Sequence, residues 1–329
     1  MDVNVTLATY SNYLVYGAMA AYTVSMFAFA WSLASMRGRD LVPAVAVPAS
    51  AEAGSVAVAT KVATTVGGPQ DGAMEPGRRA GNIAMSVMWL GTILLGLGVL
   101  LRGLSVGRAP WGNMYEFSIT GAFGIALVFL VLSLKRDLRW LGIFVVIPVL
   151  LTLGAAVTFL YTDAAQLVPA LRNYWLIIHV SAAVVCGGAF CVAAAVTLLF
   201  LVADSGERRA LAGKPYRLRW LASRLPESTK LDAMAYRITA FMFPLWTFTI
   251  VAGAIWAENA WGRYWGWDPK ETWAFITWVA YAAYLHARAT AGWKGRKAAV
   301  IGLVAFGCFL FNYFGVNILI TGLHSYAGV

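Results

Sequence analysis

The segment Trp140-Leu-Gly-Ile-Phe-Val-Val-Ile-Pro-Val-Leu-Leu-Thr-Leu-Gly-Ala-Ala-Val-Thr-Phe-Leu160 contains no charged side chain over 21 residues. A helix of about 20 apolar residues is long enough to cross the hydrocarbon core of a bilayer. Seven further segments resemble it, so the predicted spans are residues 13–34, 83–101, 115–134, 140–160, 174–203, 238–257, 270–289 and 298–320. Because lipid tolerates only closed backbone hydrogen bonding, we predict an all-α polytopic membrane helical bundle with about eight transmembrane helices.

The composition excludes an ordinary soluble fold. Only 12% of the 329 residues are charged and 60% are hydrophobic, whereas roughly a quarter of the residues in a soluble domain are charged. We interpret residues 1–329 as a single integral membrane domain. Within it, residues 41–77 are rich in Ala, Val, Gly and Pro, which is typical of a flexible linker, and we expect this linker to be cytoplasmic.

The basic residues indicate the orientation of the bundle. Residues 1–12 contain no Lys or Arg, and the first apolar run is followed by Arg37 and Arg39, the reverse of the flanks of a cleaved signal peptide. With the amino terminus outside, 20 of the 25 Lys and Arg fall in cytoplasmic segments and five outside, as basic residues in membrane proteins tend to do. We therefore expect both termini outside, and the net charge of +10 requires no nucleic-acid partner.

The three cysteines give no sign of thiol chemistry. Cys186, Cys191 and Cys308 all lie inside apolar runs, and no Cys-x-x-Cys pair occurs. Redox and zinc roles are therefore not expected, and no side chain of this chain is predicted to act as a catalytic nucleophile.

The predicted outer loop at residues 258–272 is rich in tryptophan. Six of the 14 tryptophans lie between Trp256 and Trp278. An aromatic belt at the membrane interface accounts for one or two tryptophans at a helix end, but not for this density or for Gly262 and Gly266 among them. We interpret the loop as a platform for a flat ligand.

A helix start follows the loop directly. Asp268, Pro269 and Glu271 have the spacing of an N-cap, a first helical residue and the partner residue of a capping box. The pattern predicts that a helix begins at Pro269 and holds the loop on the rim of the bundle.

The chain contains only three histidines. His179 and His324 are both expected at the outer face, where two neutral imidazoles across an aromatic cleft form an axial pair for a haem iron. His286 lies about 25 Å along its helix from Pro269 and near the cytoplasmic side. A buried hydrogen bond is the alternative there, but an ionisable residue at that depth is a functional-site hypothesis. A second axial ligand would have to be water, a residue other than histidine, or a group from another chain.

The segment Trp261-Gly-x-x-Trp265-x-Trp267-Asp268-Pro-Lys-Glu-x-Trp273 resembles the tryptophan-rich motif of haem-handling proteins in cytochrome c maturation. Together with eight spans, two outer histidines and one buried histidine, it resembles the CcsA/ResC family, called CcsB in some bacteria. The segment from Asn113 to Glu116 is similar to the family's Asn-x-Tyr-Glu pattern. The CcmC and CcmF proteins share the tryptophan motif, but this length and number of spans fit them less well.

The resemblance implies a haem site and its ligands. It implies that His179 and His324 are axial ligands of haem b at the outer face, and that His286 holds a haem in transit within the membrane, opposite a ligand from a ResB-type partner. The residues that the resemblance assigns to the platform are Trp261, Trp265, Trp267, Asp268 and Trp273.

The resemblance also implies a function. This is haem export and presentation, for covalent thioether attachment to the Cys-x-x-Cys-His segment of apocytochrome c, at the outer face of a bacterial plasma membrane. The chain would act with its ResB-type partner as a holocytochrome c synthase, or haem lyase, supported by proteins that keep the apocytochrome thiols reduced.

Two alternatives belong to other classes. An electron-carrying b-type cytochrome needs histidine pairs within its spans, whereas one histidine here is deep and two are outside. A haem-independent transporter is expected to have broken helices in repeated halves; Pro148 and Pro244 fall in mid-span, but no internal repeat is evident. Tyr115 and Glu116 are weaker site candidates, because tyrosine is common at membrane interfaces and an outer glutamate can be solvated.

Overall fold

The computed structural model describes residues 3–41, 77–166, 172–290 and 292–324. All the regular secondary structure in these ranges is helical, and turns and loops connect the helices. The helices are α1 (Val5–Ser35), α2 (Arg78–Val106), α3 (Met114–Ser133), α4 (Gly142–Thr158), α5 (Tyr174–Leu211), α6 (Arg219–Ala222), α7 (Ser228–Trp261), α8 (Pro269–Ala289), α9 (Arg296–Leu310) and α10 (Val316–Leu319), with a 3-10 turn η1 (Arg139–Leu141) and a π-helical turn η3 (Phe311–Gly315). The predicted all-α bundle is confirmed. Apart from its first and last residues, the linker at 41–77 lies outside the described residues.

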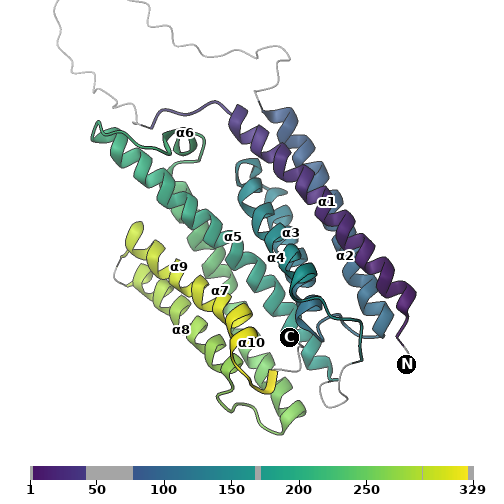
Figure 1. The fold of residues 1–329 in the computed structure, drawn as a ribbon. Coiled ribbons are helices and arrows are strands. Elements are labelled where there is room, and N and C mark those ends of the chain that lie inside the picture. Colours follow the sequence, from purple (N-terminus) through teal and green to yellow (C-terminus); the bar gives the residue numbers. More distant parts are fainter. Residues whose placement is uncertain (1–2, 42–76, 167–171, 291, 325–329) are drawn as a thin grey trace, which may run out of the picture.

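The long helices form a bundle with α5 near its middle (Figure 1). α1 pairs with α2 on one side, and α3 connects this pair to α5. α7 packs along α5, and α8 and α9 pair on the other side. α1 begins, and α10 lies, at the same end of the bundle, as expected for an even number of crossings. Which side of a membrane this end faces stays a prediction.

All eight predicted spans form helices, and one of them is more polar than the rest. Among the described residues, seven helices rather than eight are both long and apolar enough to cross a membrane: α1, α2, α3, η1 with α4, α5, α7, and α9 continuing to Leu319. The eighth predicted span forms the 21-residue helix α8, but Lys270, Glu271 and Arg288, together with several polar and aromatic residues, lower its hydropathy. α8 nevertheless packs against α7 and α9 in the place predicted for a span.

The helix starts at the two ends of the bundle differ in capping. α1, α3, α5 and α8 begin at one end, and each has an Asn or Asp side chain that accepts a backbone amide hydrogen bond; these caps are Asn4, Asn113, Asn173 and Asp268. α2, α4, α7 and α9 begin at the opposite end, and their N-cap residues make no such side-chain bond. Side-chain caps satisfy otherwise unpaired amides, so the first end is held more firmly.

Glycines allow α3 and α5 to cross closely. A Cβ atom added at Gly188 would lie 2.7 Å from the carbonyl oxygen of Gly124 and 3.0 Å from the amide nitrogen of Ile125. Both are backbone atoms of α3, which cannot move aside as a flexible side chain can. The distance between the two helices therefore depends on the missing side chain at Gly188.

We expect Gly188→Ala to destabilise the bundle by roughly 1–3 kcal/mol, the usual cost of overpacking. Gly154→Ala on α4 is the matched control, because an added Cβ there meets no atom within 4 Å and alanine favours helix by about 1 kcal/mol. The measurement is the midpoint of thermal unfolding in detergent. Equal midpoints for the two variants would show that the crossing tolerates a methyl group.

Candidate functional site

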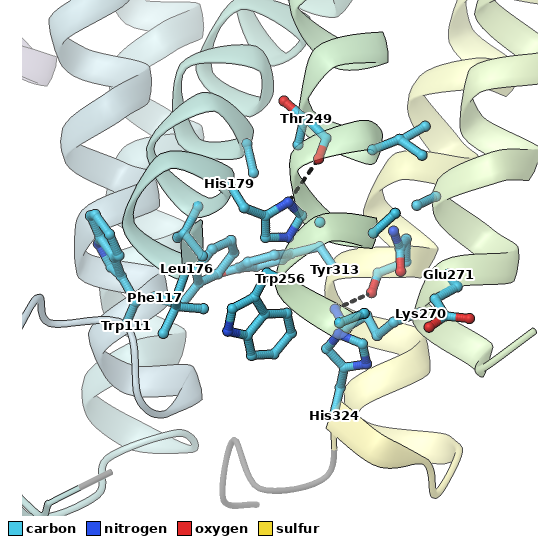
Figure 2. Close-up of a pocket in the computed structure, with 18 of the residues that line it drawn as sticks. Trp111, Phe117, Leu176, His179, Thr249, Trp256, Lys270, Glu271, Tyr313 and His324 are labelled. Atoms are coloured by element: carbon cyan, nitrogen blue, oxygen red, sulfur yellow. Dashed lines mark hydrogen bonds between the residues drawn. The ribbon is translucent and has the colours of Figure 1, made fainter. Parts of the chain in front are cut away.

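A cavity of about 180 Å³ opens at the end of the bundle where α5 and α8 begin and where α7 and α9 end. Aromatic rings make up much of its wall, among them Trp111, Trp246, Trp256, Trp261, Trp265 and Tyr313. His179 and His324 also line it (Figure 2). The cavity thus brings together two histidines that are 145 positions apart in the chain.

His179 is oriented by the backbone of α7. Its Nδ1 atom lies 2.8 Å from the carbonyl oxygen of Thr249 (Figure 2). A carbonyl can only accept a hydrogen bond, so Nδ1 carries the proton and the lone pair of the neutral ring is on Nε2. Gly253 provides the space, because a Cβ there would lie 2.7 Å from Cε1 of the ring. The imidazole is held in one tautomer and close against α7.

His324 is oriented by a carboxylate. Its Nδ1 atom donates to Oδ2 of Asp268 at 2.8 Å, and Oδ1 of the same carboxylate accepts from the amide of Leu323 at 2.7 Å. The lone pair of the neutral His324 ring is therefore also on Nε2. A carboxylate behind a histidine raises the basicity of the ring, as is common around metal ligands.

Asp268 also begins α8, as predicted. Its side chain accepts from the amide of Lys270, and the Glu271 side chain accepts from the amide of Asp268, so that the capping box is complete. Burial alone would raise the pKa of the Asp268 carboxyl, but the hydrogen bonds from His324 and from the amides of Leu323 and Lys270 bring that pKa below its ordinary value. The carboxylate that orients His324 is thus charged at neutral pH.

Trp256 lies beside both histidines. Its ring is parallel to that of His179, with an interplanar angle of 4° and centroids 6.4 Å apart. The centroid of His324 is 6.0 Å away, and Trp261 completes the group at 5.1 Å from His324. Trp256 is only 2% exposed. The two imidazoles and two indoles therefore form one contiguous aromatic group on α5, α7 and the carboxyl-terminal segment.

The predicted platform residues fall into two groups. Trp261 and Trp265 line the cavity. Asp268 does not line it, but it is hydrogen-bonded to His324, which does. Trp267 and Trp273 are not among the lining residues. The ring of Trp273 instead lies 4.2 Å from that of Phe311, so that it packs α8 against the π-helical turn η3.

Trp267 has an unusual backbone. Its φ of +59° is in the left-handed region, which is rare for a large side chain. This conformation accompanies a side chain that is 65% exposed and packs edge-on between Trp265 and Phe275. Trp267 therefore belongs to the outer surface beside the cavity rather than to its wall.

His286 lies apart from the other two histidines. It is on the last turns of α8, where its side chain is exposed, and it is not among the residues that line the cavity. The structure thus separates a two-histidine site from a single histidine on a helix surface.

Several cavity residues were not predicted as site residues. Trp256 lies just before the tryptophan motif and Lys270 lies within it, so their positions in the sequence alone indicate that they belong to the site. Trp111 and Tyr313 come from other parts of the chain, and only the packing of α3 and α9 around the cavity brings them in.

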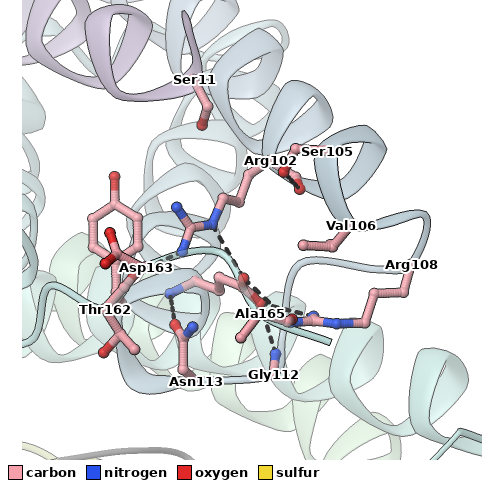
Figure 3. Close-up of polar contacts among 12 residues, drawn as sticks. Ser11, Arg102, Ser105, Val106, Arg108, Gly112, Asn113, Thr162, Asp163 and Ala165 are labelled. Carbon is pink, nitrogen blue, oxygen red and sulfur yellow. Dashed lines mark hydrogen bonds and ion pairs between the residues drawn. The ribbon is translucent and has the colours of Figure 1, made fainter. Parts of the chain in front are cut away.

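A buried charge cluster holds one wall of the cavity. Glu116 has no exposed surface and accepts hydrogen bonds from Nε of Arg102 at 3.1 Å, Nη1 of Arg108 at 2.8 Å and the amide of Gly112 at 2.8 Å. The three donors, Arg102, Arg108 and Gly112, are labelled in Figure 3. The end of α2 is thereby joined to the start of α3.

The same two arginines reach the α4–α5 connection. Arg102 donates to the carbonyl of Thr162 at 2.6 Å, and Arg108 donates to that of Ala165 at 2.8 Å (Figure 3). The α2–α3 connection, in which the Gly112 amide donates to Glu116, includes Trp111 on the cavity wall. The solvated alternative for Glu116 is wrong, because its side chain has no exposed surface and is enclosed by Arg102, Arg108 and Gly112.

We expect Glu116→Gln to destabilise the folded protein by about 3–5 kcal/mol, because two buried arginines lose their counter-charge. Asp137→Asn is the matched control: Asp137 also pairs with an arginine, Arg139, but its side chain is 59% exposed, and an exposed pair contributes about 0–1 kcal/mol. Thermal unfolding in detergent measures both variants. Similar midpoints for the two would contradict a supporting role of Glu116.

Comparisons with known proteins match this fold and site. A family model described as cytochrome C assembly protein matches residues 111–324, so that the match begins and ends at residues that line the cavity. The CcsA cytochrome c biogenesis protein of Guillardia theta is 37% identical over 247 residues, covering 71% of this chain and 81% of that protein. The CcsA protein of Microcystis aeruginosa is 36% identical, with 68% and 81% covered.

A solved structure of cytochrome c heme lyase CcmF has a similar fold. The TM-score is 0.61 at 14% sequence identity, and the match covers 99% of this chain and 49% of the CcmF chain. The chain thus spans about half the length of CcmF, and at this identity the likeness is one of fold alone.

The fold, the cavity and the matched family model define a multi-pass membrane protein of cytochrome c assembly. More particularly, the chain belongs to the CcsA family of cytochrome c biogenesis proteins. The resemblance of its tryptophan-rich motif predicted this family.

Proposed function

We propose that the chain holds haem between His179 and His324 at the outer face of the membrane and presents it for attachment to apocytochrome c. The observation that carries this proposal is the matched orientation of the two imidazoles. Each has its Nδ1 bound by the chain, to Thr249 or Asp268, which places the lone pair of the neutral ring on Nε2, the nitrogen that would bind a metal. The aromatic wall suits the apolar faces of the porphyrin.

The reaction that the proposal requires is an addition. The S–H groups of the apocytochrome Cys-x-x-Cys-His segment add across the two vinyl C=C bonds of the haem, with no leaving group. Cys186, Cys191 and Cys308 do not line the cavity, so the thiols come from the substrate. The chain's own contribution is to bind and orient the haem and to exclude competing ligands from the iron.

A second part of the proposal concerns His286. Its exposed position on α8 is unusual for an ionisable residue within the membrane, since such residues face other helices or charged partners. We propose that a ResB-type subunit covers this surface and supplies the second ligand for a haem in transit. The sequence contains no fourth histidine, so two histidines of this chain cannot form a second pair.

The cellular setting follows from the same reasoning. The distribution of 20 basic residues on one side and five on the other supports an outward-facing cavity. We propose a bacterial plasma membrane location, with thiol-reducing proteins that keep the apocytochrome cysteines available. Haem b is the proposed substrate.

The test is the absorption spectrum of the protein purified with any partner that accompanies it. We expect bands of six-coordinate haem with two imidazole ligands, and we expect His179→Ala or His324→Ala to remove them and added imidazole to restore them. His286→Ala, reloaded with haem after purification, is the control and should keep the bands of the outer site. Absence of haem, or bands that none of the three substitutions changes, would refute the proposal.

Asp268 provides a second test. Asp268→Asn should weaken haem binding by about 10- to 100-fold, because it removes the carboxylate that orients and polarises His324. Glu271→Gln changes the neighbouring carboxyl of the same capping box without touching His324, and it should have a smaller effect. Affinity is measured by titration with haem at the Soret band. An equal loss in both variants would indicate that only the turn, and not the histidine, is affected.

A further inference from the structure

Lys270 brings a basic side chain into the cavity wall. It is the second residue of α8, and among the lining residues it is the only lysine or arginine. Its Nζ atom donates to the carbonyl oxygen of Asn312 at 2.7 Å. Asn312 belongs to the π-helical turn η3, a geometry often found at functional sites. The ammonium group is thus held in place by a neutral acceptor.

The acidic groups near Lys270 are engaged elsewhere. The Glu271 carboxylate accepts from the amides of Gly266 and Asp268 and lies 3.5 Å from Arg263. The Asp268 carboxylate accepts from Leu323 and His324. Within the described residues no carboxylate lies within 4 Å of the Lys270 ammonium. A partly buried charge of this kind is favourable when an anion pairs with it.

The opposite side of the cavity is apolar. Phe117 and Leu176 lie across from Lys270 in Figure 2. The cavity therefore has a basic side, which an anion would hold in its charged form, and a hydrocarbon side. A haem has the same asymmetry, because its two carboxylates share one edge of the macrocycle and its two vinyl groups lie away from that edge.

We propose that Lys270 binds the carboxylate edge of the haem and so determines its orientation in the cavity. This inference rests on the proposed haem site at His179 and His324. The vinyl edge then points toward Phe117 and Leu176, and the thiols of the apocytochrome have to approach on that side.

The test compares two ligands and several variants. Wild-type protein and Lys270→Met are titrated with haem b and with haem dimethyl ester, in which both carboxylates are esterified. Wild-type protein should prefer haem b by about 10- to 100-fold, the effect of one hydrogen bond to a charged group. Lys270→Met should bind the two ligands with similar affinity, and Lys270→Arg should restore part of the preference. Both variants must show the Soret and visible bands of two imidazole ligands.

Lys230→Met is the matched control. Lys230 is on α7, its side chain is 70% exposed, and it pairs with Glu227 outside the cavity. This variant should keep the full preference for haem b. A preference that also fell in Lys230→Met would overturn the inference, because the effect would then come from overall charge.

The remaining outcomes separate the inference from the function on which it rests. Trp111 also lines the cavity, and its Nε1 atom makes no hydrogen bond to any described residue. If the preference survives in Lys270→Met and disappears in Trp111→Phe, the carboxylates bind to Trp111 and the inference about Lys270 is wrong. In that case the proposed function stands as long as His179→Ala still removes the bands of the haem with two imidazole ligands. Wild-type protein that forms no such bands with either ligand would refute the proposed function itself.

Discussion

The carboxylate of Asp268 joins three parts of the candidate site by hydrogen bonds. One oxygen accepts from Leu323, and the other accepts from His324 and from the first turn of α8. The end of the chain, the tryptophan loop and α8 therefore share a single buried anion. This contact adds to the packing of the His324 ring against Trp256 and Trp261 on α7.

Polar contacts stabilise the whole end of the bundle that contains the cavity, not Asp268 and its neighbours alone. Its helix starts carry Asn and Asp caps, and Glu116 with its two arginines holds the α2–α3 and α4–α5 connections. An apolar bundle in lipid gains little specificity from the hydrophobic effect, because side chains and lipid tails are equally apolar. Polar contacts at the helix ends can specify the geometry instead, and here they gather around the cavity with the two histidines.

The sequence predicted the features that follow from local pattern. Apolar runs identified the helices, and the spacing of Asp268 and Glu271 identified the start of α8 and its capping box. The sequence could not predict rotation about a helix axis or the partners of a buried charge. Trp267 is predicted to belong to the platform, and its exposed ring and left-handed backbone, which no sequence pattern indicates, place it on the surface beside the cavity. Glu116 is buried because residues from α2 enclose it.

The separation of His286 from the cavity constrains how a ligand can use both places. Residues Pro269 and His286 are 17 positions apart on α8, or about 25 Å along the helix axis. A porphyrin bound between His179 and His324 lies at the start of α8, so its iron cannot be within bonding distance of His286. The same haem can contact His286 only before or after it occupies the cavity. A single haem that used both places would therefore have to contact them one after the other, and α8 is the helix that links them.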